Sequence, residues 1–306
     1  MKIYHQLIVF AIGVALLLIL IQYWPAPPIT ISKPNPENTK PIEHFTSPVT
    51  EPNTQAWSPI YAKLYEKVFS NDEYYQLESQ MIKDVLEQHG ANEWTRAIDL
   101  GTGTGRHYRE FARDGPLLGI DNSKTMIEIA QTRNPEGDFM VGDFRQNGLV
   151  PEKSVDIVFC LGETLYLNAG SEQYTILREI HKWMKPGGIL IIHFWNIHDL
   201  DPAPQPYSQI LENKHSATYF ENLQHEAWFE PRQEVGPGVF DYEERYTIEL
   251  PDGSLKKNDE VHRVFLPPDR KTMMELLSET GWKLIEVKDL KDIGMKDREI
   301  FFLQQK

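Results

Sequence analysis

The segment that decides the fold runs from Arg96 to Asp121 and reads RAIDLGTGTGRHYREFARDGPLLGID. A short apolar strand pattern leads into Gly101, Gly103 and Gly105, and a helical pattern follows them. A glycine turn between a strand and a helix lets the backbone approach a ligand closely, and the helix N-terminus offers free N–H groups to an anion. Asp121 ends the next strand about 20 residues later, the spacing expected for an acidic residue that binds ribose hydroxyls. The segment therefore predicts a nucleoside-cofactor site.

Strand and helix patterns alternate along the chain around this segment. Apolar strand patterns cover 96–100, 116–121, 138–144, 155–162, 189–195, 282–290 and 298–305, and helical patterns cover 59–69, 73–90, 106–115, 123–133, 172–184 and 269–281. This alternation predicts an α/β fold with a doubly wound, mostly parallel sheet that has helices on both faces. Residues 240–266 alternate at period two around Asp252-Gly253, which predicts an antiparallel hairpin in a small β insert at about 200–266.

The N-terminus has the pattern of a membrane anchor. Residues 7–21, LIVFAIGVALLLILI, contain no polar side chain and have Tyr4, Tyr23 and Trp24 beside them. Together these residues reach the length of about 20 that a spanning helix needs, and the aromatic flanks are typical of a membrane interface. We therefore expect an N-terminal transmembrane helix over residues 1–24.

A cleaved signal peptide is the alternative for this segment. Its only nearby cleavage site is WPA at 24–26, where bulky Trp24 and the following Pro27 argue against cleavage. Residues 25–56 hold eight prolines and few large apolar side chains, which predicts an extended, proline-rich linker. The globular domain is then expected at 57–306, a length that fits one domain.

The composition excludes several classes of partner and site. The chain of 306 residues has a formal net charge of −14 and no cluster of Lys and Arg, so a broad nucleic-acid footprint is not expected. Cys160 is the single cysteine, which excludes an intrachain disulfide and a thiolate metal cluster. The ten histidines show no spacing typical of metal ligands, so no metal site is predicted.

The glycine spacing and Asp99 indicate the type of cofactor that this loop binds. A dinucleotide fingerprint is G-x-G-x-x-G, whereas Arg106 and His107 follow the glycines here, and Asp99 would repel a pyrophosphate. An acidic residue at this place suits a cofactor with a positive group. On these residues the chain resembles the class I S-adenosylmethionine-dependent methyltransferases. Four segments match that family in order: DLGTGTG, GIDNSKTMIEIA, GDF and MKPGG, within about residues 94–195.

The resemblance implies S-adenosylmethionine as cofactor and a role for each matching residue. Asp99 is expected to face the methionine ammonium, and Gly101, Gly103 and Gly105 to let the backbone pass under the methionyl part. Asp121 is expected to bind the ribose diol, although it could simply cap the next helix. The resemblance also implies a seven-stranded sheet whose last strand is antiparallel to the rest.

Four further residues take roles from the same resemblance. Asp143 is expected to bind the adenine amino group, and Phe144 to pack near the ring. Leu161 and Gly162, at the end of the fourth strand, are expected to border the sulfonium. Without the family pattern, Asp143 reads equally well as an exposed turn residue and Phe144 as ordinary core packing.

Catalytic candidates lie at the ends of the fourth and fifth strands. Methyl transfer mainly needs alignment and exclusion of water, and a general base helps only when the nucleophile carries a proton. The candidates for catalysis are Glu163, Tyr166 and His193. Trp195 near them, with Tyr61 and Tyr65 of the first helical pattern, could hold a cationic amine or cover the site. Core packing is the competing interpretation for all of the aromatic residues and for His193.

The sequence gives only loose indications of the methyl acceptor. The segments at 60–82 and 193–195 and the β insert loosely resemble the glycine and amino-sugar N-methyltransferases, but CLGETLYL at 160–167 has no close match there. We expect a small-molecule acceptor, such as an amine, and no nucleic acid, since a basic face and the N/D-P-P-Y/F motif are both missing. The oligomeric state and the host membrane stay open.

The sequence leaves two alternative functions open and predicts how the domain is oriented at the membrane. A catalytically inactive, membrane-bound protein with this cofactor fold and an NAD-dependent dehydrogenase are the alternatives to a methyltransferase. We expect a single-pass membrane protein whose catalytic domain faces the cytosol, where S-adenosylmethionine is made. The chain has no N-x-[ST] acceptor site, which agrees with that orientation.

Overall fold

The computed structural model describes residues 61–62, 64–65, 72–195, 216–220, 223–231, 238–250, 252–267, 269–295 and 298–306. These described residues all belong to one compact unit. The predicted anchor at 1–24 and linker at 25–56 lie outside the described residues, so both stay predictions. Within the described ranges, no helix is long and apolar enough to cross a membrane.

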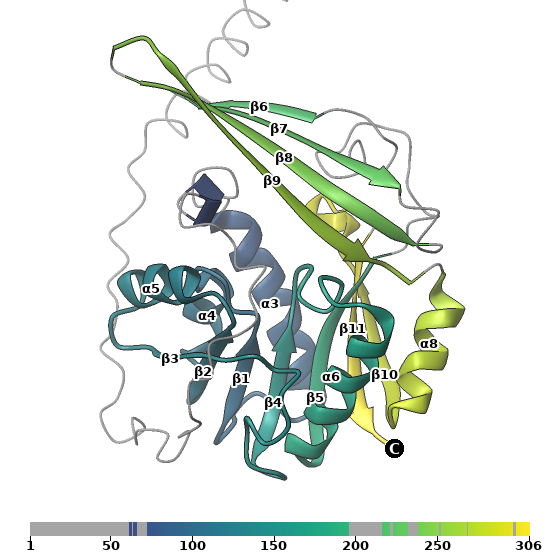
Figure 1. The fold of residues 1–306 in the computed structure, drawn as a ribbon. Coiled ribbons are helices and arrows are strands. Elements are labelled where there is room, and N and C mark those ends of the chain that lie inside the picture. The colour runs from purple at the N-terminus through teal and green to yellow at the C-terminus, as the bar shows by residue number, and fades with distance from the viewer. Residues whose placement is uncertain are drawn as a thin grey trace, which may run out of the picture. The chain divides into compact units, whose positions relative to one another are not determined.

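The main sheet has seven strands in the order β10-β11-β5-β4-β1-β2-β3 (Figure 1). Their bounds are β1 Ala97–Leu100, β2 Leu117–Asp121, β3 Asp138–Val141, β4 Val155–Cys160, β5 Met184–Trp195, β10 Trp282–Asp289 and β11 Arg298–Gln305. Strand β11 pairs antiparallel with both β10 and β5, and the pairings among β5, β4, β1, β2 and β3 are parallel. The expected mostly parallel sheet with an antiparallel last strand is therefore confirmed.

Helices cover both faces of this sheet. They are α3 Asp72–Gln88, α4 Arg106–Phe111, α5 Lys124–Arg133, α6 Gly170–Trp183 and α8 Arg270–Glu279, with the short 3-10 helix η1 at Lys291–Ile293. Alternate strand residues divide between two cores: Ile98 and Leu190 pack with α6 and α8, whereas Ala97 and Ile189 pack with α3 and α4. Side chains that alternate between two buried faces are what a doubly wound sheet requires.

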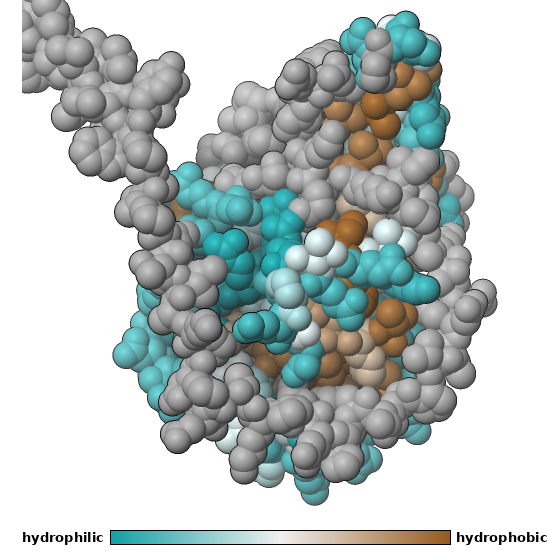
Figure 2. Space-filling model, turned by 90° about the vertical axis from the view of Figure 1, so that its left-hand side faces the viewer, coloured by the Kyte–Doolittle hydropathy of each residue, from teal (hydrophilic) through white to brown (hydrophobic). Residues whose placement is uncertain are grey.

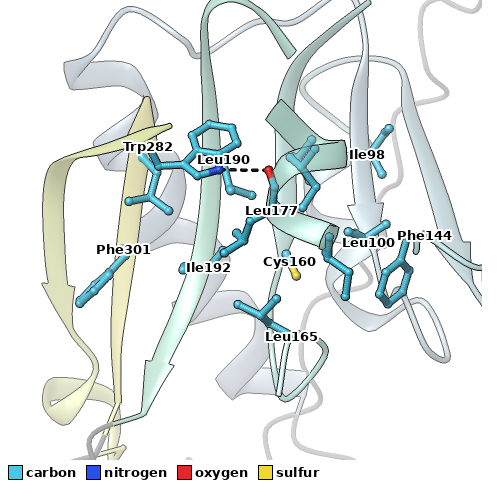
Figure 3. Packing of buried hydrophobic residues seen from close by; sticks show 14 of the residues in the cluster. Ile98, Leu100, Phe144, Cys160, Leu165, Leu177, Leu190, Ile192, Trp282 and Phe301 are labelled. Carbon is cyan, nitrogen blue, oxygen red and sulfur yellow. Dashed lines mark hydrogen bonds between the residues drawn. The ribbon is translucent and has the colours of Figure 1, made fainter. Parts of the chain in front are cut away.

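The larger core joins segments that are distant in the sequence. Figure 3 shows Leu177 of α6 beside Leu190 of β5, with Trp282 of β10 against them. The indole N–H of Trp282 donates to the carbonyl oxygen of Leu177 at 3.2 Å. This bond satisfies a buried polar group, because an unpaired indole N–H would weaken the core.

Local signals start and end the helices as expected. Ser123 caps α5, since its hydroxyl accepts from the Met126 N–H at 3.3 Å. Gly90 ends α3 at a φ of +68°, and the Ala91 N–H donates back to the Leu86 carbonyl at 2.8 Å. One boundary differs from expectation. The fifth strand, expected at 189–195, begins instead at Met184, directly after α6. Its pairing with β4 shifts register between Val155 and Ile157, so the residues between Met184 and Ile189 form an irregularity in the ladder.

The β insert is larger than the predicted hairpin. Four antiparallel strands, β6 Ser216–Phe220, β7 Leu223–Pro231, β8 Val239–Glu249 and β9 Leu255–Phe265, follow one another in chain order. The expected turn joins β8 to β9, with Gly253 at a φ of +80°. Hydrophilic and apolar residues lie side by side on the described part of the insert, at the top of the view in Figure 2.

The insert is bonded to the loop that follows β4. The Phe265 N–H donates to the Tyr166 carbonyl at 2.7 Å, and the Gln173 side chain donates to the Phe265 carbonyl at 2.8 Å. Strand β9 therefore ends beside the candidate residues at the end of β4.

Candidate active site

The candidate site lies at the edge of the sheet where the parallel strands end. Strands β1, β2, β3 and β4 run parallel, so the loops that follow them meet at this edge. Strand β11 runs the other way, and its first residue, Arg298, pairs with Trp195 at the end of β5. Residues from both ends of the domain therefore reach one place.

The glycine loop adopts a backbone that only glycine accepts without strain. Gly101, Gly103 and Gly105 have φ values of +70°, +53° and +73°. A Cβ at Gly101 would lie 2.2 Å from the Thr164 hydroxyl, whereas a Cβ at Gly103 would meet nothing within 4 Å. Gly103 therefore has an open side, which leaves its backbone accessible to a ligand.

Asp121 is bonded to the glycine loop. Its Oδ2 accepts from the Gly103 N–H at 2.9 Å, and its Oδ1 accepts from the Ser123 N–H at 2.8 Å. Burial, together with the negative charge of Asp99, raises the pKa of Asp121 to about 6 in spite of these two bonds. Each carboxylate oxygen retains a lone pair that can accept a further bond, such as one from a hydroxyl.

Asp99 is a second buried carboxylate beside the loop. It is the residue before the last of β1 and is 3% exposed, and its Oδ2 accepts from the Thr102 hydroxyl at 2.6 Å. Burial raises the pKa of Asp99 above its ordinary value. A cationic group placed here would relieve that cost, because it stabilises the ionised form.

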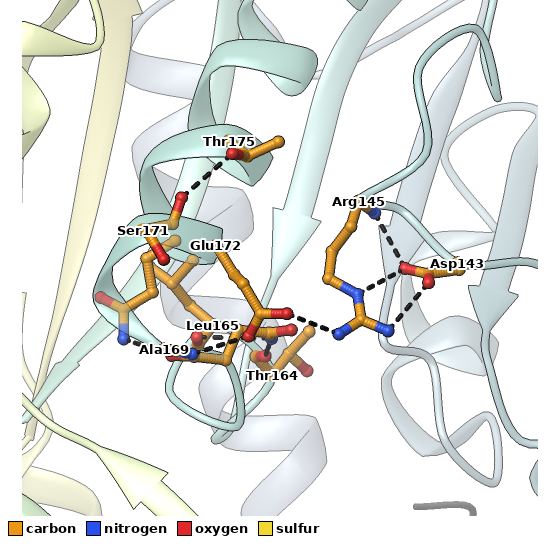
Figure 4. A network of polar contacts seen from close by, with 10 residues as sticks. Asp143, Arg145, Thr164, Leu165, Ala169, Ser171, Glu172 and Thr175 are labelled. Carbon is orange, nitrogen blue, oxygen red and sulfur yellow. Dashed lines mark hydrogen bonds and ion pairs between the residues drawn. The ribbon is translucent and has the colours of Figure 1, made fainter. Parts of the chain in front are cut away.

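Asp143 lies in a polar network that sequence reasoning did not include. Arg145 binds it with two guanidinium nitrogens, at 2.9 and 2.8 Å, and reaches Glu172 at 2.7 Å (Figure 4). Burial alone would raise the pKa of Asp143, but the bonds from Arg145 hold it below its usual value. Phe144 is buried in the larger core. The signal for this network was the Asp-Phe-Arg order, which places the two charges two residues apart.

The end of β4 is tied to β5 by a histidine. Gly162 has a φ of +62°, and its N–H donates to His193 Nδ1 at 2.9 Å. Leu161 is buried, and a Cβ at Gly162 would meet nothing within 4 Å. Gly162 thus presents an open backbone face at the edge of the sheet, as Gly103 does.

The three catalytic candidates differ in how they are engaged. Tyr166 is fully buried, and its hydroxyl donates to the His193 carbonyl at 2.7 Å. Burial raises the pKa of Tyr166 well above its ordinary value, so the phenol stays protonated at neutral pH. Glu163 is partly exposed and bonded to Arg298 at 3.2 Å. The structure brings Glu163, Tyr166 and His193 to the same edge, but only Glu163 has a partly exposed functional group.

The aromatic candidates Trp195, Tyr61 and Tyr65 are packed against other groups. The guanidinium of Arg298 lies 3.9 Å from the centre of the Trp195 ring, so one face of this indole is already covered by a cation. Tyr61 is buried and lies edge-on to Tyr246 and His262 of the insert, at 5.8 and 5.1 Å. Tyr65 contacts Tyr61 at 6.0 Å between ring centres. Arg298 is the functional candidate that sequence reasoning missed.

Comparison with known proteins agrees with this arrangement. A family model described as a methyltransferase domain matches residues 97–188. A putative methyltransferase of Geobacillus sp. (strain WCH70) is 24% identical over 253 residues, which cover 80% of this chain and 98% of the relative.

Solved structures share the fold over most of the chain. An S-adenosylmethionine-dependent methyltransferase from Clostridium acetobutylicum ATCC 824 has a TM-score of 0.65 at 13% identity, and covers 80% of this chain and 98% of its own. The sugar N-methyltransferase KedS8 from Streptoalloteichus sp ATCC 53650 has a TM-score of 0.64 at 17% identity, and covers 86% and 99%.

Residues 97–188 therefore carry a methyltransferase domain, and the fold is shared with S-adenosylmethionine-dependent methyltransferases. The cofactor is S-adenosylmethionine, and the alternative of an NAD-dependent dehydrogenase is not supported. The buried acidic residues and the two open glycines fit a ligand with a cationic end and a ribose diol.

Proposed function

We propose that this enzyme transfers a methyl group from S-adenosylmethionine to the amine of a small molecule. The observation that carries the proposal is the convergence of three backbone and side-chain elements at one sheet edge: open Gly103, the carboxylate of Asp121 bonded to it, and open Gly162. The likeness to a sugar N-methyltransferase supports an amine as the acceptor. The net charge of −14 favours a cationic small molecule over a nucleic acid.

Each cofactor-binding residue then has one task. Asp99 pairs with the methionine ammonium, while Gly101, Gly103 and Gly105 keep side chains away from the methionyl part. Asp121 accepts from the ribose hydroxyls, through the lone pairs that its bonds to Gly103 and Ser123 leave free.

The remaining cofactor contacts lie along the other strands. Asp143 accepts from the adenine amino group, and its bonds to Arg145 keep the carboxylate ionised for that contact. Phe144 packs beside the ring. Leu161 and Gly162 border the sulfonium.

S-adenosylmethionine supplies an electrophilic methyl group on a positively charged sulfur. An amine attacks only in its neutral form, so the site gains from a group that accepts the ammonium proton. Glu163 is the best candidate, because its carboxylate is partly exposed and Arg298 holds it in place. Tyr166 and His193 lie at the same edge, where the Tyr166 hydroxyl and Nδ1 of His193 are each bonded to the backbone.

The test is methyl transfer by the purified full chain to a panel of nucleotide-linked amino sugars and amino acids. Each amine is matched with an analogue that has a hydroxyl in its place. The expected result is methyl uptake by amines alone. Transfer to hydroxyl or carbon acceptors alone would overturn the amine. Binding of S-adenosylhomocysteine without transfer to any acceptor would favour the catalytically inactive alternative.

We also propose that residues 1–24 anchor the enzyme in a membrane and that the domain faces the cytosol. The support is the apolar run at 7–21 and the cytosolic source of the cofactor. Protease added to sealed cells is then expected to leave the domain intact. Complete digestion under conditions that spare a cytosolic marker would contradict the orientation, and recovery of the chain in the soluble fraction would contradict the anchor.

A further inference from the structure

A buried carboxylate connects the two segments that carry the proposed cofactor residues. Glu78 lies within α3, and its side chain is fully buried. Its Oε2 contacts Nε2 of His107 in α4, directly after the glycine loop, and its Oε1 accepts from the Tyr74 hydroxyl. The same Oε1 lies 2.9 Å from Nε2 of His193 on β5. One carboxylate therefore joins the helix after the glycine loop to the strand beside Gly162.

The charges of this group are arranged so that Glu78 is a stable anion. Burial alone would raise the pKa of Glu78, but His193 and His107 hold it well below its usual value. Burial would lower the pKa of His107, and the charge of Glu78 raises it instead. A buried charge of this kind persists only when its partners stay in place, so Glu78 holds both rings firmly.

The hydrogen bonds of His193 determine its protonation. Its Nδ1 accepts the Gly162 N–H at 2.9 Å, and an accepting ring nitrogen carries no proton. The proton of the neutral ring is therefore on Nε2, which faces Glu78. Nδ1 is bonded to Gly162, whereas Nε2 lies against the Glu78 carboxylate without hydrogen-bond geometry, so His193 could remove a proton from an acceptor only by giving up its bond to Gly162.

We propose that Glu78 and His193 are positioning residues that orient the Gly162 backbone. Glu78 selects the ring tautomer of His193, and Nδ1 of that tautomer holds the Gly162 N–H in its left-handed turn. The proposal rests on the proposed function, in which Gly162 borders the sulfonium. It replaces proton transfer by His193 with alignment of the peptide beside the reacting methyl group.

Two substitutions of His193 separate these roles. The side-chain oxygen in His193→Asn can take the place of Nδ1 and accept from Gly162, whereas His193→Gln reaches only the place of Nε2. Glu78→Gln keeps the shape and removes the charge. His89→Asn, at an exposed histidine just after α3, is the matched control.

The first measurement is hydrogen exchange of the Gly162 amide in the full chain without cofactor. The second is the dissociation constant of S-adenosylhomocysteine. In His193→Asn, the exchange rate and the dissociation constant are expected to stay within about threefold of wild type. In His193→Gln, the Gly162 amide should exchange faster, and affinity for S-adenosylhomocysteine should weaken about 2- to 10-fold, the range for one lost hydrogen bond. Glu78→Gln should also speed exchange, and His89→Asn should change neither.

Several results would overturn the proposal. Equal exchange and affinity in wild type, His193→Asn and His193→Gln would remove the role of His193, and an unchanged Glu78→Gln would remove that of Glu78. Loss of turnover in both His193 variants with exchange and affinity intact would show a general base. Nitrogen NMR of the wild-type ring needs no variant, and a proton on Nδ1 would contradict the tautomer. If the wild type binds no S-adenosylhomocysteine, only the proposed function is contradicted. Exchange of the Gly162 amide still tests the bond to His193 independently.

Discussion

Asp121 accepts a hydrogen bond from the N–H of Gly103 at 2.9 Å, so the carboxylate at the end of β2 and the open residue of the glycine loop form one bonded unit. The two residues are 18 positions apart in the chain, and parallel pairing of β1 with β2 brings them together. A ligand that uses either residue therefore meets both.

Asp121→Ala is expected to weaken S-adenosylhomocysteine binding by about 1–3 kcal/mol, the cost of losing a bond to a charged group. Calorimetry on the full chain measures this change. Asp84→Asn, at an exposed position of α3, is the control and should leave affinity unaltered. Unchanged affinity in Asp121→Ala, with the fold intact, would contradict the ribose assignment.

Stability should depend on pH through the same carboxyl group. The pKa of Asp121 is about 6 in the folded chain, whereas an unfolded Asp has about 3.9. The folded state binds more protons between these values, so the free energy of unfolding falls as pH rises from about 4 to about 6. The loss from this one group is about 2–3 kcal/mol. Urea titrations of wild type and Asp121→Asn measure this. The difference between their free energies of unfolding should change by that amount from about pH 4 to about pH 6, and a difference that stays constant would contradict the prediction.

Gly103→Ala and Gly90→Ala form a matched pair. Both glycines have positive φ, +53° and +68°, and an added Cβ meets nothing within 4 Å at either position. Each substitution should therefore cost about 1–2 kcal/mol of stability from backbone strain alone. Only Gly103→Ala should also weaken cofactor binding, because its open side faces the proposed ligand. Equal affinities in both variants would place the ligand elsewhere.

Glu163→Gln tests the proposed proton acceptor. The amide retains the shape of the side chain but cannot take a proton, so kcat should fall about 100-fold or more at neutral pH. Affinity for S-adenosylhomocysteine should change little. A kcat close to that of wild type would show that the amine loses its proton before it binds, and Glu163 would then only hold Arg298.

Short-range signals predicted much of this protein correctly. Strands β1, β2, β4, β10 and β11, the Ser123 cap and the glycine turn each depend on residues within a few positions of one another. Hydrophobic periodicity and capping act over the same distance, so they can be read directly from the chain. The cofactor class followed from the order of four such local segments.

Contacts between distant segments needed the tertiary structure. Glu163 meets Arg298 across 135 positions, because β11 returns antiparallel beside β5 and places its first residue at the site. Glu78 meets His107 and His193 only after α3 has packed on the sheet. The sequence predicted no strand at β6 or β7, which are defined by their antiparallel pairing in the insert.

The sequence by itself therefore determined the fold class, the cofactor and the residues of the glycine loop, since these follow from local backbone preferences. The tertiary structure alone decided which carboxylates are buried together, which cation each one meets and which ring nitrogen of His193 accepts from Gly162. Burial and charge pairing depend on three-dimensional distance, and the sheet order sets that distance independently of separation along the chain.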